Sequence, residues 1–359
     1  MASSSVVGLF TDILLPQMVK RIETYKLIIF TGLVSVTFSS FLIGSLFYPF
    51  LLVFLFGMAS WGIYYELLGF ANRQFVSKSV PHEFHASAWA FIFTFRSMAY
   101  TLGPFVASFM LKVGSAALIS LSIFLTVFGY MLLLLLGLSK ERKVPTDKKH
   151  IHPNLLSEIS HWKELFSVVW PVVILSLLMG IIDASFWTTG AVLTEKLSEV
   201  DQIGNFFISA YMLPSLFVGF LIMRWKPESG KKKKAIISFL IANLILLSVG
   251  FWHSSLMIIL SVFFAGIGLA FTYPLLDGVY SDITERMGKQ RLHLMGLTNS
   301  SVSMAYILGP IISGYLASKV GEQMSFTYIA MIGLIVGFIL FFVTPKKLKL
   351  PQSEIEEWK

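Results

Sequence analysis

Cysteine is absent from the 359-residue chain, and charged residues make up only 13% of it, about half the share usual in a soluble domain. The absence of cysteine excludes a disulfide framework. The scarcity of charge, together with 55% hydrophobic residues and a mean hydropathy of +0.76, excludes a set of soluble domains. Most of this chain is therefore predicted to be surrounded by lipid.

Sequence signatures of common catalytic sites are also lacking. The chain has no G-x-x-x-x-G-K-[ST] phosphate loop and no G-x-S-x-G nucleophile elbow. Residues 82–85 read HEFH, one residue short of the H-E-x-x-H zinc motif. No removable signal peptide is recognised at the start. We therefore expect a protein that is not an enzyme and that holds no cofactor or metal.

Long apolar stretches dominate the sequence, and a membrane-spanning helix needs about 20 such residues. Eleven stretches meet this requirement, which predicts an all-α integral membrane protein. They cover residues 1–18, 26–44, 50–72, 88–111, 115–138, 166–190, 203–223, 235–252, 255–280, 293–317 and 325–344.

Basic residues are distributed unevenly between the connecting segments. If the turn containing Lys20 is cytoplasmic, the cytoplasmic segments hold 24 of the 28 Lys and Arg residues, and the opposite loops hold only Lys112, Lys196 and Lys319. Short loops rich in Lys and Arg stay in the cytoplasm, so we expect a multi-pass protein of a bacterial or archaeal inner membrane, surrounded by lipid and without a nucleic-acid partner. The four lysines at 231–234 are predicted to anchor this topology, with an anionic-lipid or nucleic-acid patch as the alternative.

An eight-residue segment occurs twice. Residues 97–104 read SMAYTLGP and residues 303–310 read SMAYILGP, seven identities at a separation of 206 residues. The repeat predicts two tandem halves of the same orientation. We place the first half at 1–138 and the second at 166–345.

The two predicted halves differ in completeness. Aligning the repeats pairs Gly8 with Gly219 and leaves about 45 residues of the first half unmatched. We expect that a first helix and part of a second are missing, from an original six-plus-six arrangement. Residues 139–165 are predicted to be a cytoplasmic linker with a short helix lying on the membrane surface, and 346–359 to be a cytoplasmic tail.

Two tandem six-helix halves resemble the secondary transporters of the major facilitator superfamily. The pattern Gly8-x-x-x-Asp12, followed by Lys20 and Arg21, is similar to the loop between the second and third helices of that family. It departs from the family pattern after the aspartate, where Ile13 replaces a basic residue. The resemblance extends over essentially the whole chain and implies alternating access of two rocking halves.

Glycine–proline pairs add to the resemblance. Gly103-Pro104 and Gly309-Pro310 lie where the family carries Gly-Pro in its fifth and eleventh helices. Proline removes one helical hydrogen bond and glycine allows a close neighbour. These pairs are predicted either to mark kinks where the halves pivot or to serve tight helix packing.

Few ionisable residues lie within the predicted spans, and each is costly enough to be a functional candidate. Asp183 belongs to the first helix of the second half, which lines the cavity in the resembling family; it is predicted to couple proton and substrate, because a carboxylate in an apolar cavity can exchange a proton near neutral pH. Glu66 is a second coupling candidate. A gating charge network is predicted to comprise Asp12, Glu66, Arg96, Asp277 and Asp282. Within it, Glu66 and Arg96 are close enough to pair, and Asp277 and Asp282 are expected to form the network of the second half near the cytoplasmic rim.

Aromatic residues near the middle of the spans are candidates for the substrate cavity: Trp61, Tyr65, Tyr100, Trp187, Tyr211, Tyr273 and Tyr306. An aromatic cavity with one or two acids suits an amphipathic, drug-like molecule. We therefore expect a monomeric exporter driven by the proton gradient. The alternatives are uptake of a sugar or another neutral nutrient, and a truncated membrane protein that no longer transports and instead binds a partner protein.

Overall fold

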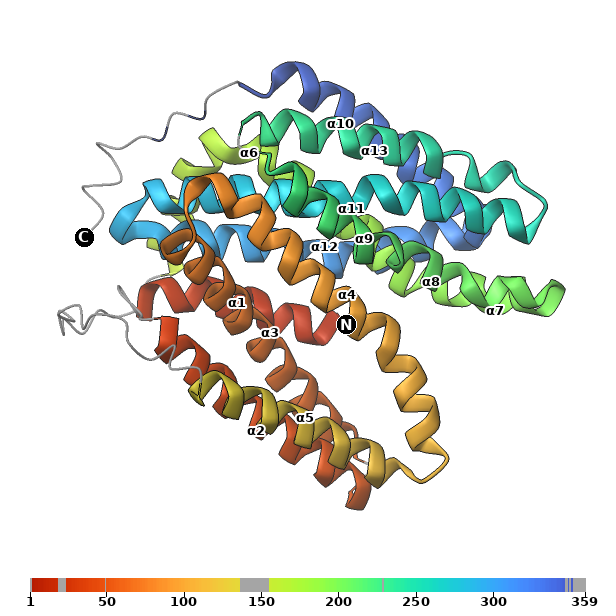
Figure 1. The fold of residues 1–359 in the computed structure, drawn as a ribbon, viewed down its shortest axis with the longest axis horizontal. Helices are drawn as coiled ribbons and strands as arrows, with labels where there is room; N and C mark the ends of the chain where they lie inside the picture. Colours follow the sequence, from red (N-terminus) through yellow and green to blue (C-terminus); the bar gives the residue numbers. More distant parts are fainter. Residues whose placement is uncertain are drawn as a thin grey trace.

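The computed structural model describes residues 2–18, 24–48, 50–135, 155–227, 229–345, 348 and 350. These residues form α-helices joined by short 3₁₀ segments, and no strand occurs among them. Figure 1 shows the later helices (green to blue) running roughly along the long axis of the molecule, with most of the earlier helices (red to yellow) inclined to them. An all-α fold, as predicted from the apolar stretches, is thus confirmed.

The helices fall into two lobes. The first lobe contains α1 (Ala2–Met18), α2 (Thr24–Phe47), α3 (Leu51–Ser79), α4 (His85–Leu111) and α5 (Ser115–Leu135). The second lobe contains α6 (Leu155–Trp187), α7 (Thr189–Val200), α8 (Phe207–Met212), α9 (Pro214–Trp225), α10 (Lys231–Leu246), α11 (Ser255–Arg286), α12 (Arg291–Val320) and α13 (Glu322–Val343).

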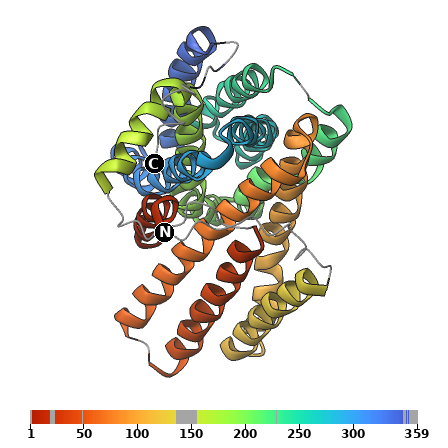
Figure 2. The same ribbon diagram turned by 90° about the vertical axis from the view of Figure 1, so that its left-hand side faces the viewer.

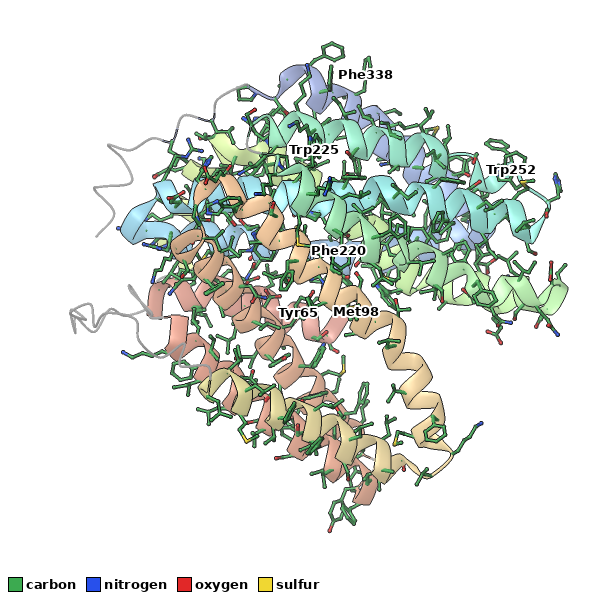
Figure 3. All side chains as sticks on the ribbon, viewed as in Figure 1. Tyr65, Met98, Phe220, Trp225, Trp252 and Phe338 are labelled. Atoms are coloured by element: carbon green, nitrogen blue, oxygen red, sulfur yellow. The ribbon has the colours of Figure 1, made fainter. Side chains whose placement is uncertain are left out.

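Nine helical segments of the described chain are long and apolar enough to cross a membrane. The two remaining predicted stretches correspond to α1 and α4. Large apolar side chains are exposed over the outer surface (Figure 3), among them Phe220 and Phe338, which are 61% and 60% exposed. A soluble protein rarely exposes so much apolar surface, so this surface fits contact with lipid.

The segment predicted to form a linker helix differs from the expectation. Residues 139–154 lie outside the described residues, but from Leu155 onward the chain forms the first turns of α6 and continues without a break to Trp187. Glu158 and Leu165 are fully buried, and Trp162 packs against the core of the second lobe. Ile159 on the same segment is 53% exposed, so its apolar face is covered only in part. The segment is the start of α6, and the separate helix on the membrane surface that we expected is not observed.

The predicted span 203–223 is interrupted. A 3₁₀ turn from Gln202 to Phe206 leads into the short helix α8, and α9 begins at Pro214. Proline fits the first turn of a helix, where its missing N–H is not needed, but it cannot continue the preceding helix. Leu213, between α8 and α9, keeps helical backbone angles (φ −55°, ψ −41°), so residues 202–225 still form one apolar span.

The lobes meet at one end of the molecule and separate toward the other. The end where they meet, here called the basic end, holds Lys78, residues 231–234 and Arg286. Figure 1 shows α4 and α5 diverging from α7 and α8 away from it. Figure 2, viewed from the basic end, shows α1 lying against the second lobe while α2 and α5 project from it. This arrangement leaves the region between the lobes as the place for a site.

Candidate functional site

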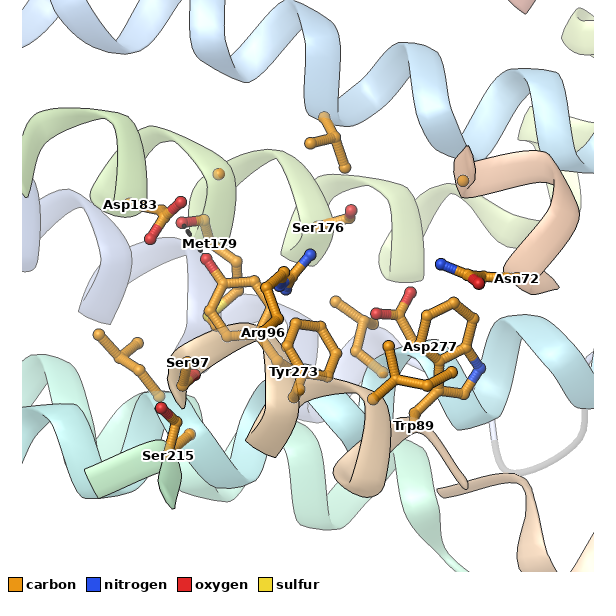
Figure 4. Close-up of a pocket in the computed structure, with 18 of the residues that line it drawn as sticks. Asn72, Trp89, Arg96, Ser97, Ser176, Met179, Asp183, Ser215, Tyr273 and Asp277 are labelled. Atoms are coloured by element: carbon orange, nitrogen blue, oxygen red, sulfur yellow. Dashed lines mark hydrogen bonds between the residues drawn. The ribbon is translucent and has the colours of Figure 1, made fainter. Parts of the chain in front are cut away.

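A cavity of about 310 Å³ lies between the two lobes. Figure 4 shows that charged side chains stand at two levels within it. Arg96 and Asp183 lie at one level, and Asp277 lies nearer the basic end beside Asn72. Both lobes contribute to each level, so relative motion of the lobes must change the cavity.

Asp183 is the central acid of this cavity. It lies on α6 and accepts hydrogen bonds from the hydroxyl groups of Tyr211 on α8 and Tyr306 on α12. The ring of Tyr211 also stacks on Phe186 at a centroid distance of 3.9 Å, which fixes its hydroxyl toward the acid. Because two donors hold one carboxylate, its hydrogen-bond network depends on whether a proton is bound.

Arg96 on α4 is the cation at the same level. Its guanidinium lies 4.1 Å from the centre of the Phe93 ring, and its Nη1 is 3.5 Å from the hydroxyl of Tyr65. Among the described residues no carboxylate oxygen lies within 4.0 Å of it. Asp183 acts on Arg96 only through its longer-range field, so the guanidinium retains hydrogen-bonding capacity toward the cavity.

The predicted aromatic residues divide into two groups. Tyr65, Tyr100, Tyr211, Tyr273 and Tyr306 line the cavity. Trp187 packs edge-on against one of these, Tyr100, with the ring centres 5.7 Å apart. Trp61 instead packs against Phe38 and Tyr64, with ring centres 5.1 and 5.3 Å away. Trp61 is thus directed toward α2 and lies outside the group of cavity residues.

A second acidic site lies where α1, α3 and α12 meet. Asp12 and Glu66 are buried with exposed fractions of 0% and 7%, and their carboxyl groups are hydrogen-bond neighbours. Ser300 donates to Asp12 at 3.2 Å, and Ser303 donates to Glu66 at 2.6 Å. Two carboxyl groups in contact must share a proton or have a counter-charge. Arg96 is not that charge, because the structure does not bring Glu66 and Arg96 together.

Arg73 joins the two lobes in the wall of the cavity, at the level nearer the basic end. Its Nη1 lies 2.8 Å from Oδ1 of Asp277 on α11, and its Nε donates to Asn299 on α12 at 2.9 Å. Its guanidinium also packs near the rings of Trp89 and Tyr280. An arginine with this many partners, 8% exposed, fixes the lobes in one arrangement.

Asp282 forms a second connection at the basic end. It binds Nζ of Lys231 at 2.8 and 2.9 Å and the ring of His85 at 2.8 Å, and the adjacent Ser281 accepts a hydrogen bond from Trp89 at 2.7 Å. We expected Asp277 and Asp282 to form a network within the second half. The structure instead joins both aspartates to side chains of the first lobe, which closes the basic end.

The glycine–proline pairs have unequal surroundings. A Cβ on Gly309 would lie 2.7 Å from that of Ala184, so this glycine allows α12 to approach α6 closely. No atom of another element lies within 4 Å of such a position on Gly103. Pro310 lies within α12 without ending it; the side chain of Pro104 lies outside the described set. Close helix packing is therefore seen at the second pair.

Sequence reasoning missed two residues of the interlobe contacts, Arg73 and His85. Arg73 was one of the 24 basic residues assigned to cytoplasmic segments, although it follows Glu66 by seven residues and so shares its helix face. A helix face with an acid inside the predicted span 50–72 and a base just after its end was the available signal. His85 gave none, because its partner lies 197 residues away.

The chain is similar to known proteins both in sequence and in fold. The family description Major Facilitator Superfamily matches residues 181–359. Multidrug resistance protein 2 of Bacillus subtilis is 26% identical over 148 residues, which are 41% of this chain and 36% of that protein. The chain thus spans about a third of the length of this relative.

Two solved structures share the fold over nearly the whole chain. The fucose:proton symporter FucP of E. coli superposes with a TM-score of 0.69 at 13% identity, covering 96% of this chain and 98% of that one. The human organic anion transporter MFSD10 gives 0.68 at 16% identity, covering 94% and 83%. Residues 181–359 thus belong to the major facilitator superfamily, and the described helices of both lobes share the fold of its solved transporters.

Proposed function

We propose that this chain is a secondary transporter, not an enzyme, and that it exports small amphipathic molecules in exchange for protons by alternating access. The observation that carries the proposal is Asp183, held by two tyrosine hydroxyls in an aromatic cavity between the lobes. The match to a multidrug resistance protein supports this substrate class. The basic end is the cytoplasmic end in this account.

The geometry supports a simple coupling scheme. Ionised Asp183 accepts from Tyr211 and Tyr306 and so draws α8 and α12 toward α6. Protonation removes the charge that orients both hydroxyls and turns the acid into a donor. We expect an amphipathic substrate that packs on the aromatic walls to compete with the proton at Asp183. Proton and substrate therefore occupy the cavity in alternation, as exchange requires.

Transport by vesicles containing the purified protein tests the proposal. We expect a pH gradient to drive movement of an amphipathic fluorescent dye, and its collapse by a proton carrier to stop that movement. Labelled fucose serves as the neutral-nutrient comparison. Gradient-driven movement of sugar without dye would replace export by uptake. If the protein moves no tested compound but stably binds a partner protein, the alternative of a membrane protein that no longer transports would be favoured.

Arg96 favours a second candidate substrate class, the organic anions. A guanidinium that faces a cavity without a carboxylate partner among the described residues is suited to binding a substrate carboxylate. The solved structure of MFSD10 is described as that of an organic anion transporter. Aromatic walls around one arginine would accept an aromatic or unsaturated acid.

Substitution of Arg96 separates the two classes. Arg96→Gln is expected to weaken transport of an aromatic carboxylic acid at least about tenfold, the size of one lost charge-assisted hydrogen bond. It should leave a neutral dye unaffected. Arg96→Lys, which keeps the charge, is the matched variant and should retain part of the activity. If the glutamine variant loses acid and dye equally, Arg96 supports the cavity and does not select the substrate.

A further inference from the structure

A second pocket, of about 600 Å³, lies at the basic end of the second lobe, away from the central cavity. It is enclosed by the first turn of α10, the last turns of α11 and the end of α13. Its walls combine the cations Lys232, Lys233 and Arg286 with the rings of Phe341 and Phe342. We call it the basic pocket.

The lysines at 231–234 are not equivalent in this pocket. Lys231 is 3% exposed and neutralised by Asp282. Lys232 donates only to the carbonyl of Pro345, at 2.7 Å, and Arg286 to two backbone carbonyls, each at 3.2 Å. Lys232 and Arg286 are close enough for their charges to repel. In the described part of the chain neither has a carboxylate within 4.0 Å.

Neutral donors complete the pocket. The hydroxyl of Thr344 is buried and has no hydrogen-bond partner among the described residues. The helix α10 begins at Lys231 directly after Gly230, whose lack of a side chain leaves the first N–H groups without a side-chain cap. A helix N-terminus of this kind favours an anion. Two cations, a hydroxyl and backbone donors together match an anion with several acceptor oxygens.

We propose that the basic pocket binds the phosphate group of an anionic phospholipid. The position of the pocket distinguishes lipid from free phosphate, because apolar side chains lead outward from it. Phe342 is 68% exposed and lies four residues beyond Phe338, also exposed on α13. Acyl chains can follow this surface while the phosphate stays among the cations. Lys232 thus has a binding role beyond that of a topological anchor.

Native mass spectrometry of the detergent-purified chain tests this site. Phosphatidylglycerol is expected to remain bound in preference to phosphatidylcholine. The double variant Lys232→Gln/Arg286→Gln should lower phosphatidylglycerol binding at least about tenfold. Lys163→Gln/Arg224→Gln removes two exposed basic residues elsewhere and is the matched control; it should keep the preference.

Two further arms make the result decisive. Thr344→Val leaves the charge unchanged and should weaken phosphatidylglycerol binding while the thermal unfolding of the protein stays as in the parent. Glycerol 3-phosphate without lipid is expected to bind far more weakly than phosphatidylglycerol. Equal loss in the pocket and control double variants would overturn the site in favour of general charge attraction. If glycerol 3-phosphate and the lipid bind equally well, the phosphate group in the basic pocket need not belong to a lipid, and the proposal of a phospholipid ligand would be overturned.

Discussion

Asp183→Asn is expected to abolish exchange driven by a pH gradient, with a fall of at least about tenfold to the level of empty vesicles. The amide has nearly the same shape and still accepts a hydrogen bond from Tyr211 or Tyr306, so the cavity should be kept. It cannot take up or release a proton. Substrate binding should therefore persist and lose its dependence on pH.

Paired measurements separate coupling from folding. Dye binding, followed by fluorescence at several pH values, should remain in the asparagine variant while gradient-driven dye movement is lost. Glu199→Gln changes an exposed acid on α7 of the same lobe and should behave as the parent. If the asparagine variant still moves dye with the gradient, Asp183 is not the coupling site, and the buried pair Asp12 and Glu66 takes its place as the candidate.

A disulfide across the basic end is expected to stop transport completely. A Cβ on Gly278 of α11 would lie 3.1 Å from that of Ala86 on α4, across the interface between the lobes. Disulfides need a Cβ separation of about 3.8 Å, so the two helices would have to move apart by about 0.7 Å at this point, where the added Cβ also lies 3.1 Å from the backbone N of Ala86. Because the chain has no other cysteine, oxidation of Ala86→Cys/Gly278→Cys can form only this bond within the chain.

A disulfide within one lobe is the control for this experiment. A Cβ on Gly268 would lie 2.8 Å from that of Ala242, and both residues belong to the second lobe. The oxidised Ala242→Cys/Gly268→Cys protein should transport as its reduced form does. Maleimide labelling after denaturation reports the fraction oxidised. Undiminished transport by fully oxidised Ala86→Cys/Gly278→Cys would show that the basic end need not open.

The repeat and the apolar stretches carried enough information for the two-lobed helical fold. The repeated segments 97–104 and 303–310 predict a two-lobed architecture directly, because segments of the same sequence are expected to occupy matching places in the two lobes. Both repeat tyrosines, Tyr100 and Tyr306, accordingly line the same cavity. Asp183 could be singled out because an acid within a membrane helix requires a reason.

Partners across the interface could not be derived in the same way. Arg73 contacts Asp277, which is 204 residues away, and no local pattern specifies that pairing. The segment containing Glu158 and Trp162 has one apolar face, but a protein groove and a membrane surface attract such a face equally. Trp61 illustrates the same difficulty, because a helix that is apolar on all sides does not show which face meets the cavity.

Distances between spin labels on the two lobes test the central claim, alternating access, most directly. Val113 and Val200 are 71% and 83% exposed, lie in different lobes and stand at the end opposite the basic end. Lys78 and Arg224 serve as the pair at the basic end. Lowering the pH in the absence of substrate is expected to shorten the first distance and lengthen the second. Both distances staying fixed, or changing in the same direction, would contradict alternating access of the two lobes.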